Sequence, residues 1–461
     1  MSALVAILNR RTGAALVSLA LPFSPLSATD GSADDRLRQE VEELRELVRQ
    51  QGARIEALET NNQNQRSVDV VVADTSKTRR NGKLSDAQPT GRFPDDAIVT
   101  SGDFPGSISI PGRGGSVRIG GFVRADVVHD VDSVGFEDLV LNRTIPLDGD
   151  NGDGDSQTRL SARLSRINVD FRRNTERGLF RTFIEADFFG GGDELLSNYE
   201  FRLRHAAAQF GDFYAGQWWS SFADVRSLPE SGDFAGPLGK VALRQPGLRW
   251  ARNVSPRTRL GLAFENPAGD LSGPSPALSS DSVPDTIAYI QRSGDWGHIK
   301  LAGLVRRLDA RRASTWAGGI NVTGRVSFDW LSERDNLAFQ LQLGSGVTRY
   351  LAGFAGSGLD GTVSDEGQID TADLISGFAA YQHWWSNRLR STIAIGAMRL
   401  ESAETADSLS FERGVYAGIN LFWTPIDGAN FGFDIIRASR YTLADRDGDG
   451  TRLLATARFD F

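Results

Sequence analysis

The sequence predicts an all-β protein, a transmembrane antiparallel β-barrel preceded by a short α-helical coiled coil. From residue 116 to the C-terminus, short segments alternate between apolar and polar side chains, and clusters of Gly, Asp, Asn and Pro separate them. Such repeated alternation indicates a membrane barrel, because successive side chains of a strand point to opposite faces. Beyond the N-terminus, no segment approaches the roughly 20 apolar residues that a spanning helix needs. The chain also ends on an aromatic residue, Phe461.

The final segment, residues 451–461, is the most regular of these strands. Its odd positions from Leu453 to Phe461 are apolar, whereas Thr456, Arg458 and Asp460 fall on the opposite face. Outer-membrane barrels pair their first strand with their last, and they typically end on a strand whose final residue is Phe. We therefore expect residues 451–461 to close the barrel.

Composition narrows the classes of function. The absence of Cys removes disulfides, zinc ribbons and thiol catalysis, and it suits a chain that is exported through an oxidising compartment. The formal net charge of -8 gives no indication of nucleic-acid binding. The sequence contains no nucleophile elbow and no phosphate-binding loop. We expect neither an enzyme nor a bound cofactor.

The N-terminus predicts export. Arg10 and Arg11 precede an apolar run, residues 13–23, and the small residues Ser27 and Ala28 follow it. A positive segment, an apolar stretch too short to span a bilayer and a small-residue cleavage site indicate a secretory signal peptide over residues 1–28. The alternative interpretation is a buried helix.

A heptad pattern covers residues 34–62. The seam positions are Leu37, Val41, Leu44, Val48, Gln51, Ile55, Leu58 and Asn62. A helix that is charged on its other faces buries such a seam by self-association, which predicts a coiled coil. The polar Gln51 and Asn62 leave dimer and trimer open, and a single amphipathic helix lying on the barrel is the alternative. Residues 63–115 are polar and contain several Pro, so they are predicted to be a linker.

In the barrel region, residues 116–461, the free-energy cost of placing a charge in lipid decides which face of each strand points outward. Ile119 and Val123 share one face of a predicted strand, and Arg118 and Arg124 share the other. An Arg on the lipid face costs roughly 2 to 4 kcal/mol at the bilayer midplane, so the Arg faces should line the lumen. The same alternation recurs in residues 180–188, 260–265, 337–343, 389–397, 415–423 and 431–435. The predicted lumen is cationic although the protein is acidic.

Residues 160–171 break the alternation by one position. A β-bulge near Ser165 would restore it and would place Arg163 and Arg166 on the inner side. Guanidinium groups present paired donors that match a carboxylate or a phosphate. The candidate lumen-lining and solute-binding residues are Arg118, Arg124, Arg163, Arg166, Arg181, Arg202, Arg204, Arg244, Arg249, Glu185, Asp187 and Glu265.

Seven motifs, taken in order, resemble one known family. They are GSISIPG at 106–112, IGGFVRADVV at 119–128, GQWWSSF at 216–222, LRQPGLRWAR at 243–252, AFENPAGD at 263–270, PDTIAYIQRSGDWGHIKLAGLVRRL at 284–308 and INLFWTP at 419–425. Together they are similar to the DcaP-like outer-membrane porins over about residues 100–461. The resemblance implies a 16-stranded trimeric porin whose coiled coils meet in the periplasm and which favours small anions such as dicarboxylates. By length alone, 14 or 18 strands would also fit residues 116–461.

We therefore expect an outer-membrane porin for passive diffusion of small anions, in which inward Arg residues lower the barrier to a dianion. A phosphate-selective or general porin is the alternative. A structural class also stays open, in which a plugged barrel is tethered to the cell wall by its coiled coil. The expected partners are further copies of the chain as a homotrimer, outer-membrane lipid and small anionic solutes. The coiled coil is expected in the periplasm.

Two further patterns carry weaker expectations. Asp445, Asp447 and Asp449 have the spacing of the first half of an EF-hand loop, but Thr456 stands where such a loop has its bidentate Glu. We expect a solvated outer loop there, with weak Ca²⁺ binding as the alternative. The Trp pairs at 218–219 and 384–385 are expected at the membrane interface or the barrel rim.

Overall fold

The structure is a computed structural model that describes residues 102–110, 114–193, 198–273, 281–311, 313–328, 331–402 and 406–461. The predicted signal peptide at 1–28, the coiled coil at 34–62 and most of the linker at 63–115 lie outside the described residues, so they stay predictions. Within the described end of that linker, β1 (Ile108–Ile110) pairs with the start of the first barrel strand.

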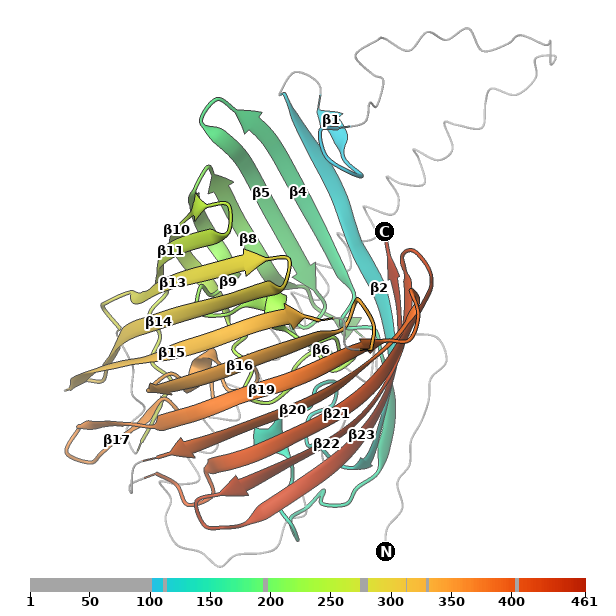
Figure 1. Ribbon diagram of the computed structural model, residues 1–461. Coiled ribbons are helices and arrows are strands. Elements are labelled where there is room, and N and C mark those ends of the chain that lie inside the picture. Colours follow the sequence, from blue (N-terminus) through green and yellow to red (C-terminus); the bar gives the residue numbers. More distant parts are fainter. Residues whose placement is uncertain are drawn as a thin grey trace, which may run out of the picture. The chain divides into compact units, whose positions relative to one another are not determined.

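Within the described residues, 16 antiparallel strands form a closed barrel when β3 and β4 are counted as one interrupted strand (Figure 1). The predicted fold class and strand number are confirmed. The barrel strands are β2 (Gly115–Asp132), β3 (Gln157–Ser161), β4 (Arg166–Thr175), β5 (Gly178–Asp187), β8 (Arg202–Phe210), β9 (Phe213–Trp219), β10 (Arg244–Ser255), β11 (Thr258–Glu265), β13 (Asp285–Gly294), β14 (Gly297–Asp309), β15 (Ser314–Ser327), β16 (Asn336–Ser345), β19 (Asp373–Trp384), β20 (Leu389–Glu401), β21 (Phe411–Ile426), β22 (Ala429–Thr442) and β23 (Asp447–Asp460).

The barrel closes where β2 pairs with β23, as the terminal alternation predicts. Val123 lies opposite Phe459 in this antiparallel ladder. The backbone N–H of Phe461 donates to the Gly121 carbonyl at 3.1 Å, and the Gly121 N–H donates to the Phe461 carbonyl at the same distance. Gly121 has a φ of +157°, and a Cβ there would lie 2.1 Å from the Arg166 carbonyl oxygen. The seam therefore requires glycine, which has no side chain, at position 121.

The lipid face follows the alternation. Ile119, Val123 and Val127 on β2 are exposed, and Leu160 on β3 is 78% exposed. Between them on β2, Arg124 is half-buried and Asp126 is buried. Apolar side chains thus face outward and charged ones face the lumen, which avoids placing guanidinium groups in hydrocarbon.

The irregularity predicted near Ser165 is a break rather than a single bulge. Residues 162–165 leave the ladder between β3 and β4. The Ser165 hydroxyl replaces the missing backbone partner, because it accepts from the Arg124 N–H at 3.0 Å and donates to the Arg124 carbonyl at 3.2 Å. The break keeps both Leu160 and Ile167 on the exposed face, which the alternation alone did not allow.

Connections differ between the two barrel ends. At the end that holds Phe461, called the short-turn end, several hairpins close in two residues, for example at 211–212 and 256–257. At the opposite end, called the long-loop end, residues 133–156, 220–243 and 346–372 connect strands. Short elements lie in the long connections: η2 (Asn142–Thr144), β6 (Gly192–Asp193), β7 (Asn198–Tyr199), η3 (Val225–Ser227), β12 (Leu271–Ser272), η4 (Thr348–Tyr350), β17 (Gly361–Val363) and β18 (Ile369–Thr371).

An apolar core lies inside the barrel. Val134, Phe222, Leu238 and Tyr350 come from the three long connections and are almost fully buried. They pack in one cluster with inward side chains of the wall, such as Ile436. Part of the barrel interior is therefore filled by folded-in loops. No helix in the described part of the chain combines the length and apolar character needed to cross a bilayer.

Candidate functional site

The connection of residues 220–243, called the inward loop, folds into the barrel and is fixed to its wall. Lys300 of β14 donates from Nζ to the carbonyls of Ser221 and Ala223 at 2.7 and 2.6 Å. Arg390 of β20 donates to both carboxylate oxygens of Glu230, at 2.6 and 2.5 Å. Anchors on separate strands hold the loop along its length.

The tip of the inward loop reaches the strands at the barrel seam. The Gly232 N–H donates to the Asp434 carboxylate of β22 at 3.1 Å, and Arg124 of β2 donates to the Gly232 carbonyl. Lys240 donates from Nζ to the carbonyls of Phe234 and Gly236 at 2.8 and 2.6 Å, which holds the tip in a tight turn. Burial lowers the pKa of Lys240 to about 8.

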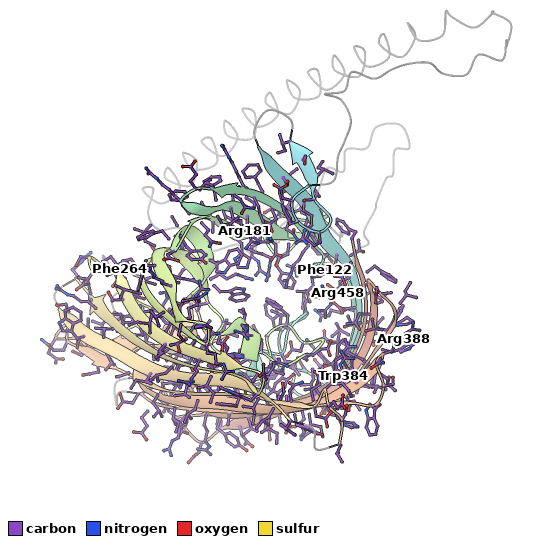
Figure 2. All side chains as sticks on the ribbon, turned by 45° about the horizontal axis from the view of Figure 1, so that its top comes forward. Phe122, Arg181, Phe264, Trp384, Arg388 and Arg458 are labelled. Atoms are coloured by element: carbon purple, nitrogen blue, oxygen red, sulfur yellow. The ribbon has the colours of Figure 1, made fainter. Side chains whose placement is uncertain are left out.

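The part of the wall formed by β2, β4, β5 and β8 carries arginines that point into the lumen. In the view of Figure 2, Arg181 and Arg458 lie on the lumen side and Phe264 lies on the outer side. Arg181 donates to Asp170 at 2.8 Å from Nε, and Arg172 donates to the same carboxylate. This Asp170 group lies toward the short-turn end of the wall.

Nearer the long-loop end lies a denser group, called the arginine cluster, which consists of Arg166, Arg202, Arg204 and Arg244 with Glu185 and Asp187. Arg202 binds both oxygens of Asp187, at 3.0 and 2.7 Å. Arg204 donates to Glu185 and to Asp187, each at 2.7 Å. Four guanidinium groups thus share two carboxylates, which leaves a formal excess of two positive charges (4 − 2).

Arg166 and Arg244 account for this excess. The closest approach of Arg166 to a carboxylate is 3.8 Å, from Nη1 to Glu185, and its Nε has no hydrogen-bond partner among the described residues. The Nη1 of Arg244 likewise lacks a partner in the described part of the chain. Buried donors of this kind are costly unless a ligand or water accepts from them.

Phe234 at the tip of the inward loop faces the cluster. The centre of its ring lies 5.3 Å from the guanidinium carbon of Arg166, 5.1 Å from that of Arg204 and 6.0 Å from that of Arg244. These distances fit cation–π contacts. The loop tip therefore packs against the cationic wall, and the inward loop narrows the lumen beside it. We call this level the constriction.

Comparison with known proteins fits this geometry. The family model described as DcaP outer membrane protein matches residues 106–461. This chain belongs to the DcaP outer membrane protein family. The resemblance found in the seven motifs is confirmed, and the family and the fold indicate an outer-membrane channel rather than an enzyme.

The solved structure of another DcaP channel shows a similar fold. The crystal structure of the outer membrane channel DcaP of Acinetobacter baumannii is similar with a TM-score of 0.66 and 22% identity, covering 76% of this chain and 98% of that one. OmpT of Vibrio cholerae in a trimer form has a TM-score of 0.49 and 12% identity, covering 75% and 99%. OmpF of Salmonella typhi in complex with daunomycin has a TM-score of 0.48 and 10% identity, covering 76% and 99%. No curated protein sequence matches the chain.

The predicted site residues of this DcaP family member do not form one group. Arg166, Arg202, Arg204, Arg244, Glu185 and Asp187 come together in the arginine cluster. The other predicted residues lie elsewhere on the inner wall: Arg118 beside Phe104, Arg124 with Asp126, Arg163 with Asp138, Arg181 with Asp170, and Arg249 and Glu265 in a separate pocket under the inward loop. Inward arginines thus extend along the wall, and the arginine cluster is their densest group.

Several residues of the constriction were not predicted. Phe234 and Lys240 lie in a connection without periodicity, so alternation gave no signal for them. Trp218 was expected at the membrane interface or the barrel rim, and the interface position is wrong. It lies inside the barrel, with its ring 4.2 Å from that of His205 and 5.2 Å from that of Phe183. Tyr214 and Trp218 fall on one face of β9 at period two, which could have indicated the inward position.

The acidic segment near the C-terminus is partly strand. β23 begins at Asp447, so Asp447 and Asp449 belong to the barrel rim rather than to a free loop. Asp445 and Asp449 are near Arg413 and Arg437 respectively. Across the described residues, no group of three or more His, Cys, Asp or Glu side chains is arranged to hold a metal ion.

Proposed function

We propose that this chain forms a passive channel for small anions, with dicarboxylates as the preferred solutes. The observation that carries the proposal is the excess positive charge at the arginine cluster, opposite the loop tip that narrows the lumen. Arg166 and Arg244, whose charges have no close carboxylate partner among the described residues, come from β4 and β10, so two separate strands supply the excess positive charge that attracts a passing anion.

The cluster is suited to transient binding. A guanidinium group presents paired N–H donors that match a carboxylate, and a dianion can engage two such groups at once. Glu185 and Asp187 partly compensate the guanidinium charges, which keeps binding weak enough for release, as conduction requires. A dicarboxylate is favoured over phosphate by the family resemblance, and a phosphate-selective or general porin is the alternative that a titration distinguishes.

The same proposal includes orientation and assembly. Outer-membrane barrels place short turns in the periplasm and long loops outside, so we place Phe461 and the predicted coiled coil on the periplasmic side. The heptad seam supports self-association, and the family resemblance supports a homotrimer. The competing structural role, a plugged barrel that tethers the membrane to the cell wall, predicts a closed lumen.

Titration of single-channel current tests the solute preference. The purified full chain in a planar bilayer should be blocked by succinate at lower concentration than by phosphate. Arg166→Gln and Arg244→Gln should each weaken succinate block by about tenfold, since a charge-assisted hydrogen bond contributes about 1.5 to 3 kcal/mol. The outward-facing Arg399→Gln is the matched control. Stronger block by phosphate supports the alternative porin class, and absence of current supports the tether.

A further inference from the structure

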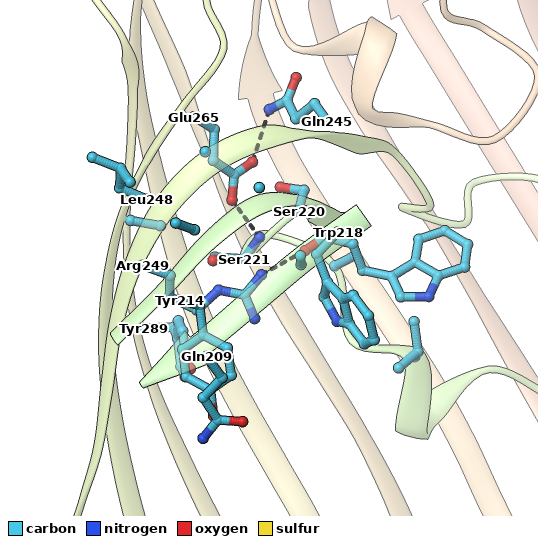
Figure 3. Close-up of a pocket in the computed structure, with 18 of the residues that line it drawn as sticks. Gln209, Tyr214, Trp218, Ser220, Ser221, Gln245, Leu248, Arg249, Glu265 and Tyr289 are labelled. Carbon is cyan, nitrogen blue, oxygen red and sulfur yellow. Dashed lines mark hydrogen bonds between the residues drawn. The ribbon is translucent and has the colours of Figure 1, made fainter. Parts of the chain in front are cut away.

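A pocket of about 340 Å³ opens inside the barrel between the wall of β8–β11 and residues 220–226 of the inward loop. We call it the side pocket. Its volume lies in the range of small-molecule sites, about 300 to 1,000 Å³. In Figure 3, Arg249 lies in its middle, between Glu265 and Tyr214. The side pocket shares no lining residue with the arginine cluster.

The side pocket is cationic. Arg226, Arg249, Arg259 and Lys300 line it together with the carboxylates of Asp224 and Glu265, and a fifth lining cation, Arg181, is paired with Asp170. Both carboxylates are already engaged by the protein. Glu265 accepts from the Ser221 N–H at 2.6 Å and from the Gln245 amide at 2.7 Å, while Asp224 bonds the His298 ring at 2.8 Å and accepts from Thr323 at 2.9 Å. The lining therefore keeps an excess of positive charge, which favours the binding of an anion in the side pocket.

Arg249 is held in place with one donor unused. Its Nη2 donates to the Trp219 carbonyl at 2.6 Å, and its buried Nε has no hydrogen-bond partner in the described part of the chain. The hydroxyl of Ser221, a residue only 1% exposed, is also without a partner among the described residues. Both residues belong to the lining, so the side pocket has hydrogen-bonding capacity at its wall that the described residues do not use.

The remaining walls are aromatic. Tyr214, Trp218 and Tyr289 line the side pocket. Their rings lie beside its cations: the Arg249 guanidinium carbon is 5.8 Å from the centre of the Tyr214 ring, and Lys300 Nζ is 4.5 Å from that of Tyr289. Aromatic faces next to fixed donors suit a ligand with a flat ring and a charged end.

Two facing glycines form part of the pocket wall. Gly216 of β9 lies opposite Gly247 of β10, and both line the side pocket. Gly216 has a φ of +116°, and a Cβ there would lie 2.2 Å from the Ala206 carbonyl oxygen. This part of the wall is therefore bare backbone, which lets a flat group approach closely.

We propose that the side pocket binds aromatic carboxylates, with the carboxylate at Arg249 and Ser221 and the ring among Tyr214, Trp218 and Tyr289. The inference rests on the proposed function, because the solute must enter the lumen as an anion. It goes further by naming a second class of solute and a second site. The arginine cluster is suited to dianions, which engage two guanidinium groups, whereas the side pocket takes a single carboxylate and selects for the ring.

Calorimetric titration of the full chain in detergent tests this without relying on conduction. Benzoate is the probe, and cyclohexanecarboxylate is the control with the same charge and a similar size. Benzoate should bind at least about threefold more tightly, within the range that aromatic pairing contributes. Arg249→Gln should weaken both ligands by about tenfold. Tyr214→Leu should abolish the preference for benzoate, and Tyr214→Phe should retain it.

The paired variant Arg166→Gln/Arg244→Gln separates the two sites, because it should leave benzoate binding within about twofold while it weakens succinate. Equal affinities for benzoate and cyclohexanecarboxylate in the unaltered chain would overturn the proposal. So would a loss of benzoate binding in the paired variant with none in Arg249→Gln. If Arg249→Gln does not assemble, Tyr289→Leu takes its place, and an unchanged preference there counts against the site. Failure of the anion channel itself would appear as cation selectivity in a salt gradient.

Discussion

Arg204 of β8 and Asp187 of β5 form an ion pair that is shielded from solvent, with Arg204 Nη1 2.7 Å from Asp187 Oδ2. Breaking a buried pair by removing one partner typically costs about 3 to 5 kcal/mol. The pair therefore fixes the arginine cluster and also sets how much of its charge is compensated.

Asp187→Asn should raise anion selectivity and lower stability together. The substitution removes one of the two carboxylates of the cluster, so Arg202 and Arg204 present more uncompensated charge to the lumen. The reversal potential in a salt gradient should move further toward the chloride equilibrium potential, and the barrel should unfold at a lower temperature. Glu401→Gln, in an exposed pair with the outward-facing Arg399, is the control. An unchanged reversal potential in assembled Asp187→Asn channels would argue against the cluster as the selective element.

Phe234→Ala should widen the constriction. The substitution removes the ring that faces Arg166, Arg204 and Arg244, together with cation–π contacts of about 0.5 to 2 kcal/mol each. Single-channel conductance should rise and block by succinate should weaken. Phe264→Ala, on the exposed face of β11, removes the same ring outside the lumen and should leave conductance unchanged. Equal conductance in both variants would show that the loop tip does not limit the pore.

Raising pH should reduce anion selectivity through Lys240. Burial lowers its pKa to about 8, whereas an unfolded chain keeps the proton to about 10.4. The free energy of unfolding should therefore increase as pH rises through this range, because the unfolded chain binds more protons. Over the same range the inward loop loses one positive charge. The neutral amine still has two N–H groups for Phe234 and Gly236, so the loop should hold its shape. The reversal potential should shift between pH 7 and 9 in the unaltered chain and less in Lys240→Met; identical shifts would contradict this.

Deletion of Phe461 should impair assembly more than function. The residue contributes two backbone hydrogen bonds to Gly121 across the seam and an exposed ring on the lipid face. The yield of folded barrel, measured by its resistance to unfolding in detergent, should fall. Phe461→Leu keeps the backbone bonds and should fall less. Full recovery of the deleted chain would mean that the seam is fixed elsewhere.

Much of the barrel follows from the sequence because one physical rule acts on every strand. Arg124 and Arg181 could be placed in the lumen since hydrocarbon excludes guanidinium groups, and Phe461 identified the closing strand. The same rule explains why the strand near Ser165 required a break. Strand number came from the family resemblance, because length alone admitted neighbouring even values.

The constriction could be predicted only in part. Alternation predicts which face of a strand a side chain occupies but not its level along the barrel axis. That level depends on the register between strands, which is set by pairings far apart in the chain. Arg118 and Arg166 therefore looked equivalent, although only Arg166 lies at the cluster. Phe234 and Lys240 were missed because an irregular loop has no period, and its path was set by distant partners such as Asp434 and Arg390. Trp218 was expected at the interface or the rim because Trp is enriched at membrane interfaces.

The most direct test of the account is the reversal potential of the purified channel in a planar bilayer under a potassium chloride gradient. The unaltered chain should be anion-selective, and Arg166→Gln/Arg244→Gln should lose most of that selectivity. Arg399→Gln/Arg437→Gln, which removes two exposed arginines from β20 and β22, should keep it. A cation-selective channel, or equal selectivity in all three proteins, would contradict the claim that the arginine cluster selects the solute.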